Sequence, residues 1–582
     1  MFPQKKQFLS GGQIIFNKLV KNNVNDVFLY SGGAIMGLID CFYNQNKIQY
    51  YIHTHEQNLG HAATGYARTT NKPGICIVTS GPGITNMITP MLDAQNDSTP
   101  LIVFSGNVQL SAMGTNAFQE APAVELTKNI TKWSYCVKKV SELNEVLDEA
   151  FTISQDGKKG VVHIDLPKCI LSDKMEYFNI DKTHYMSKMK LIKENELNEI
   201  SNVINNSEKP VFYVGQGCNN YSTELTKLVE KSNIPITTTI HAMGCYDETK
   251  DLSLKFLGMH GSVYANKSIQ ESDCIIALGS RFDDRTTGNL NLYAPNAKKA
   301  FENKKGGIIH CNINNNEINN VVQTHYNVNS DCGLFIKDIT PKIEYKKRQP
   351  WLNQIKTWKH KYPFTYNQNE NMYTQDVLIE LNKQISEKND IIFTTGVGNH
   401  QMMAAQFIDW KSPKTFISSG SLGVMGFGLP AAIGAAIGNP DKTVIDIDGD
   451  GSFLMTLSDM KTAVQYDLQN LKVIILNNKT LGMVDTWEKL FYDNRITATD
   501  NKFAPSFYDV AKSFGFKALQ CNNKKNLYNT LRLFLKTPGP ILCEFNVNST
   551  ECFPLVAPGK ALDNMILNKS QEQNIDKTIP PS

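Results

Sequence analysis

The chain of 582 residues is 41% hydrophobic, which excludes a disordered or fibrous protein and predicts roughly two to four packed domains. Its 59 Lys and Arg residues nearly balance its 56 Asp and Glu residues, so the charge gives no reason to expect nucleic acid or an anionic membrane as a partner. No apolar run approaches the roughly 18 residues of a membrane span, residues 1–10 lack the apolar segment of a signal peptide, and the 12 cysteines form no C-x-x-C pair. We therefore expect a soluble intracellular protein of the cytoplasm or plastid stroma, without a signal peptide or a recognisable presequence.

Short apolar runs alternate with longer amphipathic segments, which is the pattern of βα units that build parallel sheets. In the first block, the predicted strands are 27–30, 75–80, 101–106 and 161–167. A polar stretch over 173–209 predicts a linker with one helix. In the second block, the predicted strands are 210–217, 234–239, 274–280 and 307–313. In the third block, they are 391–398, 415–420, 443–450, 472–478 and 541–547.

These blocks predict an α/β fold of three doubly wound parallel-sheet domains. We place the domains at 1–175, 195–345 and 375–550, followed by a C-terminal tail at 551–582. The first and third blocks are candidates for distant structural duplicates. Because ligands of such sheets gather at the carboxyl ends of the strands, motifs at those positions are the most informative.

The strongest motif is GDGS at the end of a predicted strand, followed by paired asparagines at the end of the next one. Asp450 supplies a carboxylate, the flanking Gly449 and Gly451 let the backbone approach a phosphate, and the N–H groups that follow can receive the anion. Asn478 and a carbonyl near Thr480 supply further oxygen ligands, and an all-oxygen set predicts Mg²⁺ rather than zinc. Alone, GDG also fits a glycine turn between a strand and a helix. With the asparagine pair at this spacing, the pattern resembles the thiamine-diphosphate enzymes.

Such an enzyme needs a carboxylate that faces the aminopyrimidine ring of its cofactor, and Glu56 is the candidate. Glu56 lies in HEQNLGHAATGYAR, where the glycines and alanines indicate a tightly packed helix behind it. A zinc site of His55, Glu56 and His61 is disfavoured, because histidines six residues apart do not share a helical face. A capping or surface glutamate is the plainer alternative.

Further segments narrow the resemblance to one family. The chain resembles the catalytic subunit of acetohydroxyacid synthase, also called acetolactate synthase, over nearly its whole length. GDG with the asparagine pair defines only the superfamily, whereas the segments AFQE, LGMHG, SRFDDRTTGN and LGMVDTW are much narrower. Other matching segments are SGGAI, VTSGPGITNMITPMLDA, HIDLPK, TTGVGNHQMMAAQ and SSGSLGVMGFGLPAAIGAA.

The resemblance implies roles for residues around the cofactor. Glu56 would hydrogen-bond the pyrimidine ring, and Met425 would hold the cofactor in the bent form that brings its reacting atoms together. Asp450, Asn478 and Thr480 would bind the metal ion. The remaining cofactor-binding positions that the resemblance implies are Val397, Gly398, Asn399, His400, Gly423, Gly451, Ser452, Gly482 and Met483.

The resemblance also implies a site for two 2-oxo acids. Arg285 matches an arginine that binds the carboxylate of the acceptor, a bidentate task suited to guanidinium. Trp487 matches an indole that favours the longer 2-oxobutanoate over pyruvate. Seen alone, Arg285 is more simply a salt-bridged residue and Trp487 a core residue. The other matching positions are Gln119 and Lys168 as catalytic residues and Phe118, Met259 and Met483 in the substrate pocket.

For the middle block the resemblance implies bound FAD, although the glycine loop there lacks the third glycine of a dinucleotide fingerprint. Two positions depart from the family. Lys158-Lys159-Gly160 stands where Arg-Pro-Gly is usual, and Asn312 replaces an acidic residue. The FAD contacts that the resemblance implies are Lys158, Gly215, Gly217, Gly258, His260, Arg281, Asp283 and Asp331.

The leading hypothesis is a transferase that joins pyruvate to pyruvate or 2-oxobutanoate, the first common step of valine and isoleucine biosynthesis, with thiamine diphosphate, Mg²⁺ and FAD. The resemblance implies a homodimer or tetramer with active sites between subunits, and a separate small regulatory subunit. Two alternatives stay open: a related thiamine-diphosphate carboligase, decarboxylase or oxidase of 2-oxo acids, and an inactive homologue that serves as a scaffold. The intact set of Glu56, Asp450 and Asn478 disfavours the scaffold.

Overall fold

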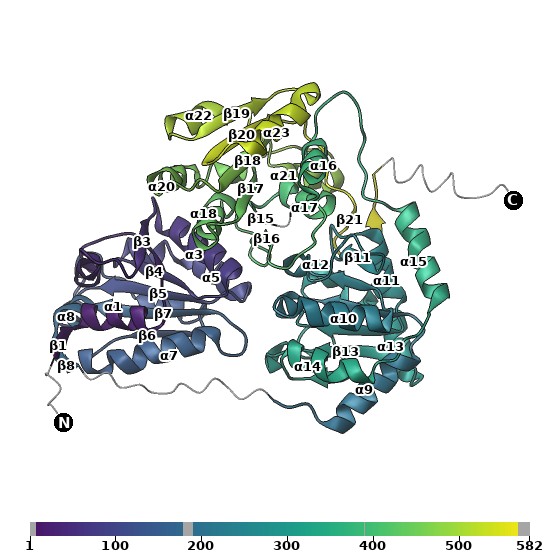
Figure 1. Ribbon diagram of the computed structural model, residues 1–582, viewed down its shortest axis with the longest axis horizontal. Coiled ribbons are helices and arrows are strands. Elements are labelled where there is room, and N and C mark those ends of the chain that lie inside the picture. Colours follow the sequence, from purple (N-terminus) through teal and green to yellow (C-terminus); the bar gives the residue numbers. More distant parts are fainter. Residues whose placement is uncertain (1–6, 178–189, 389, 569–582) are drawn as a thin grey trace.

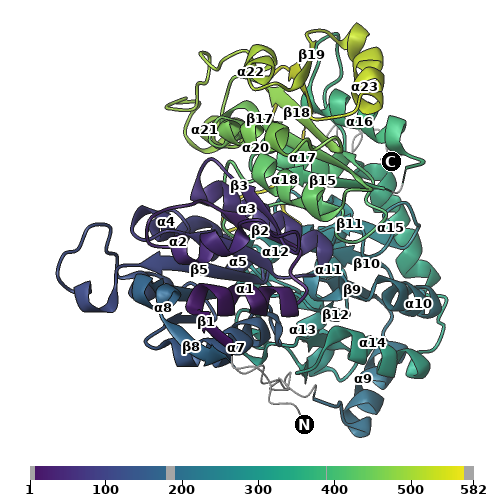
Figure 2. The ribbon, with the colours of Figure 1, turned by 60° about the vertical axis from the view of Figure 1, so that its left-hand side comes forward.

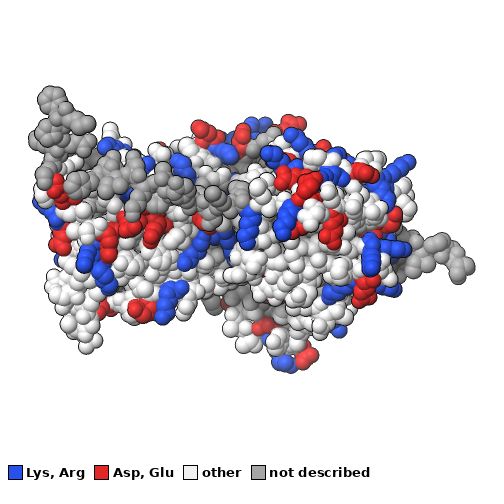
Figure 3. Space-filling model, turned by 90° about the horizontal axis from the view of Figure 1, so that it is seen from below, with Lys and Arg blue, Asp and Glu red and all other residues white. Residues whose placement is uncertain are grey.

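The computed structural model describes residues 7–177, 190–388 and 390–568. Three parallel sheets of six strands each form the centres of three domains (Figure 1), which confirms the predicted fold class. Within the described part of the chain, none of the helices combines the length and the apolar character that a membrane span requires. Figure 3 shows positive and negative side chains interspersed over one face of the molecule, as their nearly equal numbers predict.

The N-terminal sheet has the strand order β3-β2-β4-β5-β7-β6. Its central strands are apolar on both faces: Ile75 and Ile77 of β4 enter one hydrophobic cluster, whereas Cys76 and Val78 enter another. Helices therefore cover both faces of the sheet. The strands are β2 (Asp26–Leu29), β3 (Gln49–Ile52), β4 (Gly74–Val78), β5 (Leu101–Asn107), β6 (Trp133–Cys136) and β7 (Val161–Pro167). The helices are α1 (Gly11–Lys21), α2 (Met36–Ile39), α3 (Glu56–Thr70), α4 (Pro82–Thr85), α5 (Ile88–Asn96), α6 (Ala123–Thr127), α7 (Leu143–Gln155) and α8 (Lys168–Ser172).

The C-terminal sheet has the order β16-β15-β17-β18-β20-β19. When strands are numbered within their own domain, this sheet and the N-terminal sheet share one order: second, first, third, fourth, sixth, fifth. The two domains are therefore topological duplicates. The strands are β15 (Ile391–Thr395), β16 (Phe416–Ile417), β17 (Thr443–Gly449), β18 (Leu471–Asn477), β19 (Lys517–Cys521) and β20 (Ile541–Asn546). The helices are α16 (Thr374–Ile385), α17 (Asn399–Phe407), α18 (Gly428–Gly438), α19 (Asp450–Phe453), α20 (Met460–Gln465), α21 (Gly482–Phe491), α22 (Phe507–Ser513) and α23 (Leu527–Lys536).

The middle sheet has a different order, β11-β10-β9-β12-β13-β14, which is the order of dinucleotide-binding sheets. The described part of the predicted tail packs on this domain, where Val556 N donates to Met259 O (2.9 Å). The strands are β9 (Pro210–Val214), β10 (Ile236–Thr238), β11 (Ser253–Phe256), β12 (Cys274–Leu278), β13 (Gly307–Cys311) and β14 (Tyr326–Val328). The helices are α9 (Glu194–Asn206), α10 (Ser222–Ser232), α11 (Val263–Glu271), α12 (Asp284–Thr287), α13 (Pro295–Glu302), α14 (Cys332–Ile339) and α15 (Gln349–Lys361).

Helices α3 and α18 join the two duplicate domains. Both connect the second strand of their sheet to the third, and they pack against each other in both ribbon views (Figures 1 and 2). A Cβ atom at Gly65 would lie 2.1 Å from Ala431 O, and one at Gly434 would lie 1.8 Å from Ala62 O. Only glycine permits backbones this close, which explains the glycines and alanines that the sequence concentrates in both helices.

Two kinds of expectation need correction. The predicted strands 210–217 and 391–398 end three residues earlier, at Val214 and Thr395, because their glycines turn the chain. Within the three six-stranded sheets, five strands were not predicted, and each lies at a sheet edge; the two-stranded pairs β1 (Gln7–Ser10) with β8 (Lys174–Tyr177) and β21 (Leu555–Val556) with β22 (Met565–Ile566) were not predicted either. Edge strands are exposed on one side and lack a continuous apolar run, so their pattern is weak. The five edge strands are β3, β6, β11, β14 and β19. Of the predicted linker, α9 is the expected helix, and 178–189 lie outside the described residues.

Candidate active site

The predicted metal residues lie at the carboxyl edge of the C-terminal sheet. Asp450 begins α19 directly after β17, and its side chain is buried. Asn501 Nδ2 donates a hydrogen bond to Asp450 Oδ2 (2.6 Å). Burial raises the pKa of Asp450 to about 6, opposed by the Asn501 hydrogen bond. A divalent cation beside this carboxylate would favour its ionised form.

Next to Asp450, polar groups converge that the protein itself does not satisfy. Asn478 follows β18, and its Oδ1 accepts from Thr480 N (3.2 Å). A Cβ atom at Gly482 would lie 2.8 Å from Asn399 Nδ2 and 3.1 Å from Asn478 Nδ2, so glycine leaves room for both amides. Asn399 Oδ1 and His400 Nε2 are buried without a hydrogen-bond partner, although Asp448 Oδ1 lies 3.4 Å from His400 Nε2. Orphaned buried polar atoms indicate a polar ligand at this edge.

Met425 lies in the loop between β16 and α18. Gly426 N donates to Ser452 Oγ (2.9 Å), which fixes this loop beside α19. Met425 Cε is 3.6 Å from the position that a Cβ atom of Gly451 would occupy. The structure therefore brings the predicted cofactor residues of this domain to one edge: Val397, Gly398, Asn399, His400, Gly423, Met425, Asp450, Gly451, Ser452, Asn478, Thr480, Gly482 and Met483.

Glu56 occupies the corresponding edge of the N-terminal sheet. It begins α3 after the short loop that follows β3, it is 7% exposed, and its Oε2 accepts from Asn86 Nδ2 (2.9 Å). A Cβ atom at Gly81 would lie 3.0 Å from Gln119 O, so the loops after β4 and β5 touch at the same edge. Asn86 and Asn501 are the partners that motif analysis missed. Neither belongs to a spaced motif with its acid, and only the fold brings them together.

The predicted substrate residues fall into two groups. Met259 and Arg285 of the middle domain are in contact, with Arg285 Nη1 3.5 Å from Met259 Sδ. Trp487 lies one turn after Met483 on α21 and packs edge-on against Phe491, with ring centroids 5.2 Å apart. The second group belongs to the N-terminal domain.

Phe118 and Gln119 lie in the loop after β5, which projects from the body of the molecule (Figure 2), and Phe118 is 87% exposed. Lys168 is the exposed first residue of α8. Among the described residues, no hydrogen bond or ion pair joins these three to Arg285 or Trp487.

The residues predicted to hold FAD mostly contact the protein. Gly215 and Gly217 are required by the neighbouring strand end, because their Cβ atoms would lie 2.3 and 2.9 Å from atoms of Gly279. Lys158 Nζ pairs with Glu317 Oε1 (2.7 Å) across two domains. Arg281 donates to Asn96 O (2.7 Å).

Four other residues that were predicted to hold FAD lie in the middle domain. Asp283 and Asp331 cap α12 and α14. Gly258 has a φ of +119°, which favours glycine, and burial lowers the pKa of His260 to about 4. Lys158, Arg281, Asp283 and Asp331 are thus bonded to the protein, whereas His260 Nδ1 is buried without a hydrogen-bond partner.

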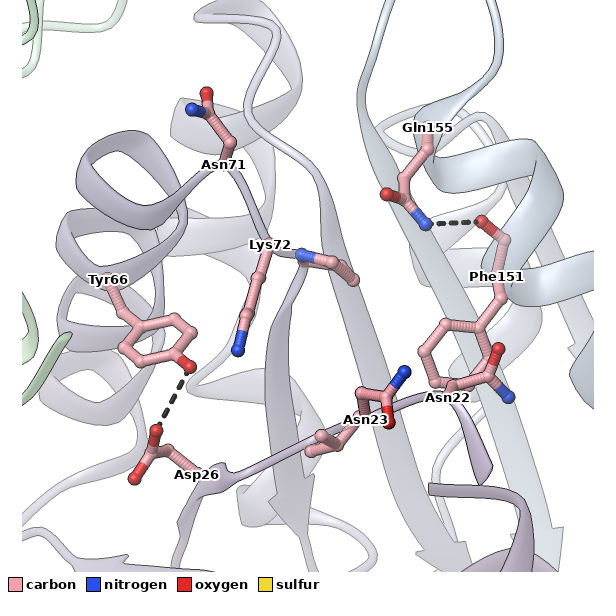
Figure 4. Close-up of a pocket in the computed structure, with 10 residues that line it drawn as sticks. Asn22, Asn23, Asp26, Tyr66, Asn71, Lys72, Phe151 and Gln155 are labelled. Atoms are coloured by element: carbon pink, nitrogen blue, oxygen red, sulfur yellow. Dashed lines mark hydrogen bonds between the residues drawn. The ribbon is translucent and has the colours of Figure 1, made fainter. Parts of the chain in front are cut away.

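Two cavities lie away from this site. One of about 170 Å³ opens at the amino ends of β2 and β4, where Tyr66 Oη donates to Asp26 Oδ2 (3.0 Å; Figure 4). The other, of about 460 Å³, lies between the middle and C-terminal domains near Glu248 and Lys255. Neither is lined by a predicted site residue, and ligands of parallel sheets bind at the opposite, carboxyl ends of the strands.

Two duplicate sheets that offer a buried acid and a GDG edge, with a dinucleotide-type sheet between them, define the class of thiamine pyrophosphate enzymes. Three domain models of this class match the chain: the N-terminal TPP binding domain at residues 9–126, the central domain at 197–339 and the C-terminal TPP binding domain at 396–545.

Similar proteins narrow the class further. "Acetolactate synthase, mitochondrial" of Schizosaccharomyces pombe is 43% identical over 96% of this chain and 87% of its own length. "Acetolactate synthase catalytic subunit, mitochondrial" of Saccharomyces cerevisiae is 42% identical over 96% and 84%. "Acetolactate synthase, chloroplastic" of Arabidopsis thaliana is 38% identical over 96% and 84%. The chain belongs to the acetolactate synthase family.

Proposed function

We propose that this protein is an acetolactate synthase. As a transferase, it decarboxylates pyruvate and joins the two-carbon unit to a second 2-oxo acid, pyruvate or 2-oxobutanoate, in the first common step of branched-chain amino-acid biosynthesis. The observation that carries the proposal is the pair of sheet edges, one with buried Glu56 and the other with Asp450, in a chain of this family. When bound, thiamine diphosphate would supply an ionisable C2–H group, whose carbanion is the nucleophile, and a cationic thiazolium ring that accepts the electron pair released with CO₂.

The C-terminal edge fits the diphosphate of that cofactor with Mg²⁺. Asp450, Asn478 and the carbonyl of Thr480 supply hard oxygens, which Mg²⁺ prefers. The unsatisfied Asn399 Oδ1 and His400 Nε2 are available to the diphosphate group and its waters. Met425, held beside Gly451, would contact the cofactor and would favour the bent form in which its two rings are close.

At the N-terminal edge, Glu56 holds or accepts a proton at the pyrimidine ring. Its burial and the Asn86 hydrogen bond fix the carboxylate in one orientation. Arg285 binds the acceptor carboxylate, and Gln119, Lys168, Phe118, Met259, Met483 and Trp487 line the path and pocket for the two substrates. These roles follow the resemblance to the family.

The exposure of Phe118 supports an active site between subunits. This phenylalanine is 87% exposed on a projecting loop of the domain that carries Glu56, so its ring is available to a second copy of the chain. The domain that carries Asp450 likewise exposes Met455, Val484 and Phe503. We infer a homodimer, or a tetramer of such dimers, in which the N-terminal edge of one copy covers the C-terminal edge of the other. The subunit name of the yeast relative supports a separate regulatory partner.

We also propose that the middle domain binds FAD, on the basis of its strand order and of the family resemblance. Lys158 and Arg281 already serve interdomain contacts, so we propose FAD as structural rather than as a redox partner. A flavin spectrum that bleaches during turnover would contradict this. The division at 1–175, 195–345, 375–550 and 551–582 is the proposed domain arrangement.

The compartment is proposed as cytoplasm or plastid stroma. The relatives' names place them in mitochondria or chloroplasts. Residues 1–6, on which the predicted lack of a presequence depends, lie outside the described residues.

Product analysis tests the function. Purified protein with Mg²⁺, thiamine diphosphate and pyruvate should release CO₂ and 2-acetolactate, which is identified by mass spectrometry. With 2-oxobutanoate added, the mixed product should form as well. Acetaldehyde as the sole organic product would contradict the proposal and favour a simple decarboxylase.

A further inference from the structure

The duplicate domains hold each other through equivalent carboxylates. In each domain, the segment after the third strand carries a buried aspartate: Asp97 follows α5, and Asp459 ends the short 3₁₀ helix η9 (Leu457–Asp459). Each aspartate contacts a loop of the other domain. Asp459 contacts the loop that precedes α3, and Asp97 contacts the loop that precedes α18. These loops lead to Glu56 in one domain and contain Met425 in the other.

Asp459 fixes the loop before α3. His53 Nδ1 donates to Asp459 Oδ2 (2.8 Å), and Thr54 N lies 3.4 Å from Asp459 Oδ1. The neighbouring Tyr466 Oη accepts from Ile52 N (2.8 Å). Glu56 follows Thr54 by two residues, so the backbone that aims its carboxylate is held by groups of the C-terminal domain.

Asp97 fixes the loop before α18 in the same manner. Its Oδ2 accepts from Gly420 N (3.0 Å), and its Oδ1 accepts from Ser421 N (3.0 Å). Asp93, one helical turn earlier, accepts from Ser419 Oγ (2.5 Å), which in turn accepts from Val424 N (2.9 Å). The next residue is Met425, so the N-terminal domain sets the backbone of the cofactor support.

Asp97 lies beside a histidine and an arginine at the junction of the three domains. His241 Nε2 of the middle domain lies 3.1 Å from Asp97 Oδ2, and Arg68 Nη1 of α3 lies 3.9 Å from it. Arg68 also donates to Ser418 O (2.6 Å) at the start of the same loop. Burial would raise the pKa of Asp97, but attraction to His241 and Arg68 outweighs burial and lowers it. An ionised carboxylate can accept from two backbone N–H groups at once, whereas an asparagine side chain offers one acceptor.

We propose that Asp97 and Asp459 are paired positioning residues, each of which extends from one cofactor-binding domain to set the cofactor-contacting loop of the other. The proposal rests on the proposed function, because Glu56 and Met425 are its targets. A carboxylate that merely stabilised the fold would not need to bond the backbone of these two loops. Both contacts lie within one chain, so they exist whether or not copies associate.

The test measures three quantities for Asp97→Asn and Asp459→Asn: the melting temperature without cofactor, the dissociation constant of thiamine diphosphate with Mg²⁺, and the exchange rate of the cofactor C2 proton. Asp459→Asn should slow C2 proton exchange by roughly 10- to 100-fold with little change in cofactor affinity, because misplacing a reacting group costs rate. Asp97→Asn should slow the exchange and also weaken cofactor binding severalfold, because Met425 contacts the cofactor directly.

The matched control is Asp376→Asn. Asp376 is an equally buried carboxylate of the C-terminal domain that accepts from Tyr373 N (2.9 Å) and touches neither loop. It should lower the melting temperature without slowing exchange. If either main variant fails to fold, Ser421→Ala and Thr462→Ala remove single donors to Asp97 and Asp459 and should slow exchange less, in the same direction.

Exchange rates in the Asp97 and Asp459 variants equal to that of Asp376→Asn would overturn the positioning proposal alone. Wild-type protein that neither binds thiamine diphosphate nor exchanges its C2 proton would instead overturn the proposed function. The two failures are therefore distinguishable.

Discussion

The N-terminal and C-terminal domains share one strand order but present different chemistry at the same edge. At the N-terminal edge, the buried acid Glu56 is oriented by an amide. At the C-terminal edge, glycines, amides and Asp450 surround unsatisfied polar atoms. The comparison teaches that the sheet fixes where a ligand binds, and the loops after the strands decide which part of it is held.

The helices α3 and α18 illustrate the same division. The middle turns of the two helices pack in the same way, because each contributes a glycine that lies against a backbone carbonyl of the opposite helix. Their first turns differ, because α3 begins with Glu56 and α18 begins with Gly428 after the Met425 loop. Packing therefore preserves the duplicate core while the ends of the helices diverge.

The largest expected effect is on turnover, and it distinguishes the role of the N-terminal edge from that of the C-terminal edge. Glu56→Gln removes the acid but keeps the shape, so turnover should fall by roughly 10²- to 10⁴-fold while thiamine diphosphate still binds through the C-terminal edge. Steady-state kinetics and calorimetry measure both quantities. Glu125→Gln, at an exposed glutamate of the same domain, serves as the control and should leave both unchanged. Undiminished turnover in Glu56→Gln would show that another group does this work.

The contact between α3 and α18, which is common to both duplicate domains, can be tested by filling the space at its two glycines. Gly65→Ala and Gly434→Ala place a methyl group against a carbonyl of the opposite helix, so each should destabilise the protein by about 1–3 kcal/mol, as overpacked cores do. Chemical denaturation measures the free energy of unfolding. Gly33→Ala, where a Cβ atom would meet nothing within 4 Å, is the matched control. If only one of the two helix variants were destabilised, the helices would not be equivalent.

The substrate residues of the C-terminal domain give a smaller effect. Trp487→Leu should lower the ratio of mixed product to 2-acetolactate from equal pyruvate and 2-oxobutanoate by roughly tenfold, because one methylene in an apolar pocket is worth about 1–3 kcal/mol. Mass spectrometry of the two products measures the ratio. Trp133→Leu, in edge strand β6 of the duplicate domain, should not change it. An unaltered ratio in Trp487→Leu would remove Trp487 from the acceptor pocket.

The middle domain lies outside the duplicate pair, and there we expect the smallest effect, a change in the pH dependence of stability. Burial raises the pKa of Glu248 to about 8, opposed by Lys255 and reinforced by Asp409 and Asp247. The folded state therefore retains a proton that the unfolded chain releases above its ordinary carboxyl pKa, and stability is lost as the pH rises towards 8.

Glu248→Gln does not titrate, so its free energy of unfolding relative to wild type should rise between pH 5 and 8 by at least about 1.4 kcal/mol, the equivalent of one pKa unit. Denaturation at several pH values measures the difference. A constant difference would show that Glu248 is ionised in the folded protein.

Much of the fold could be predicted because the central strands are apolar on both faces. Runs such as 161–167 coincide with β7, whereas β3 and β19 escaped prediction because they are partly exposed at sheet edges. The site was predictable where one motif holds its parts, as in Asp450 with Asn478. Asn86, Asp97 and Asp459 were not, because they meet their partners only through packing between elements or domains. The roles of the predicted site residues stay predictions.

The central claim is that Glu56 of one copy of the chain and Asp450 of another copy hold opposite ends of the same cofactor molecule. Glu56→Gln and Asp450→Asn should each be nearly inactive alone. A heterodimer of the two variants, purified through two different tags after co-expression, retains one intact site of two and should recover about half of the wild-type activity by symmetry. Activity no higher than that of either parent variant would contradict the claim.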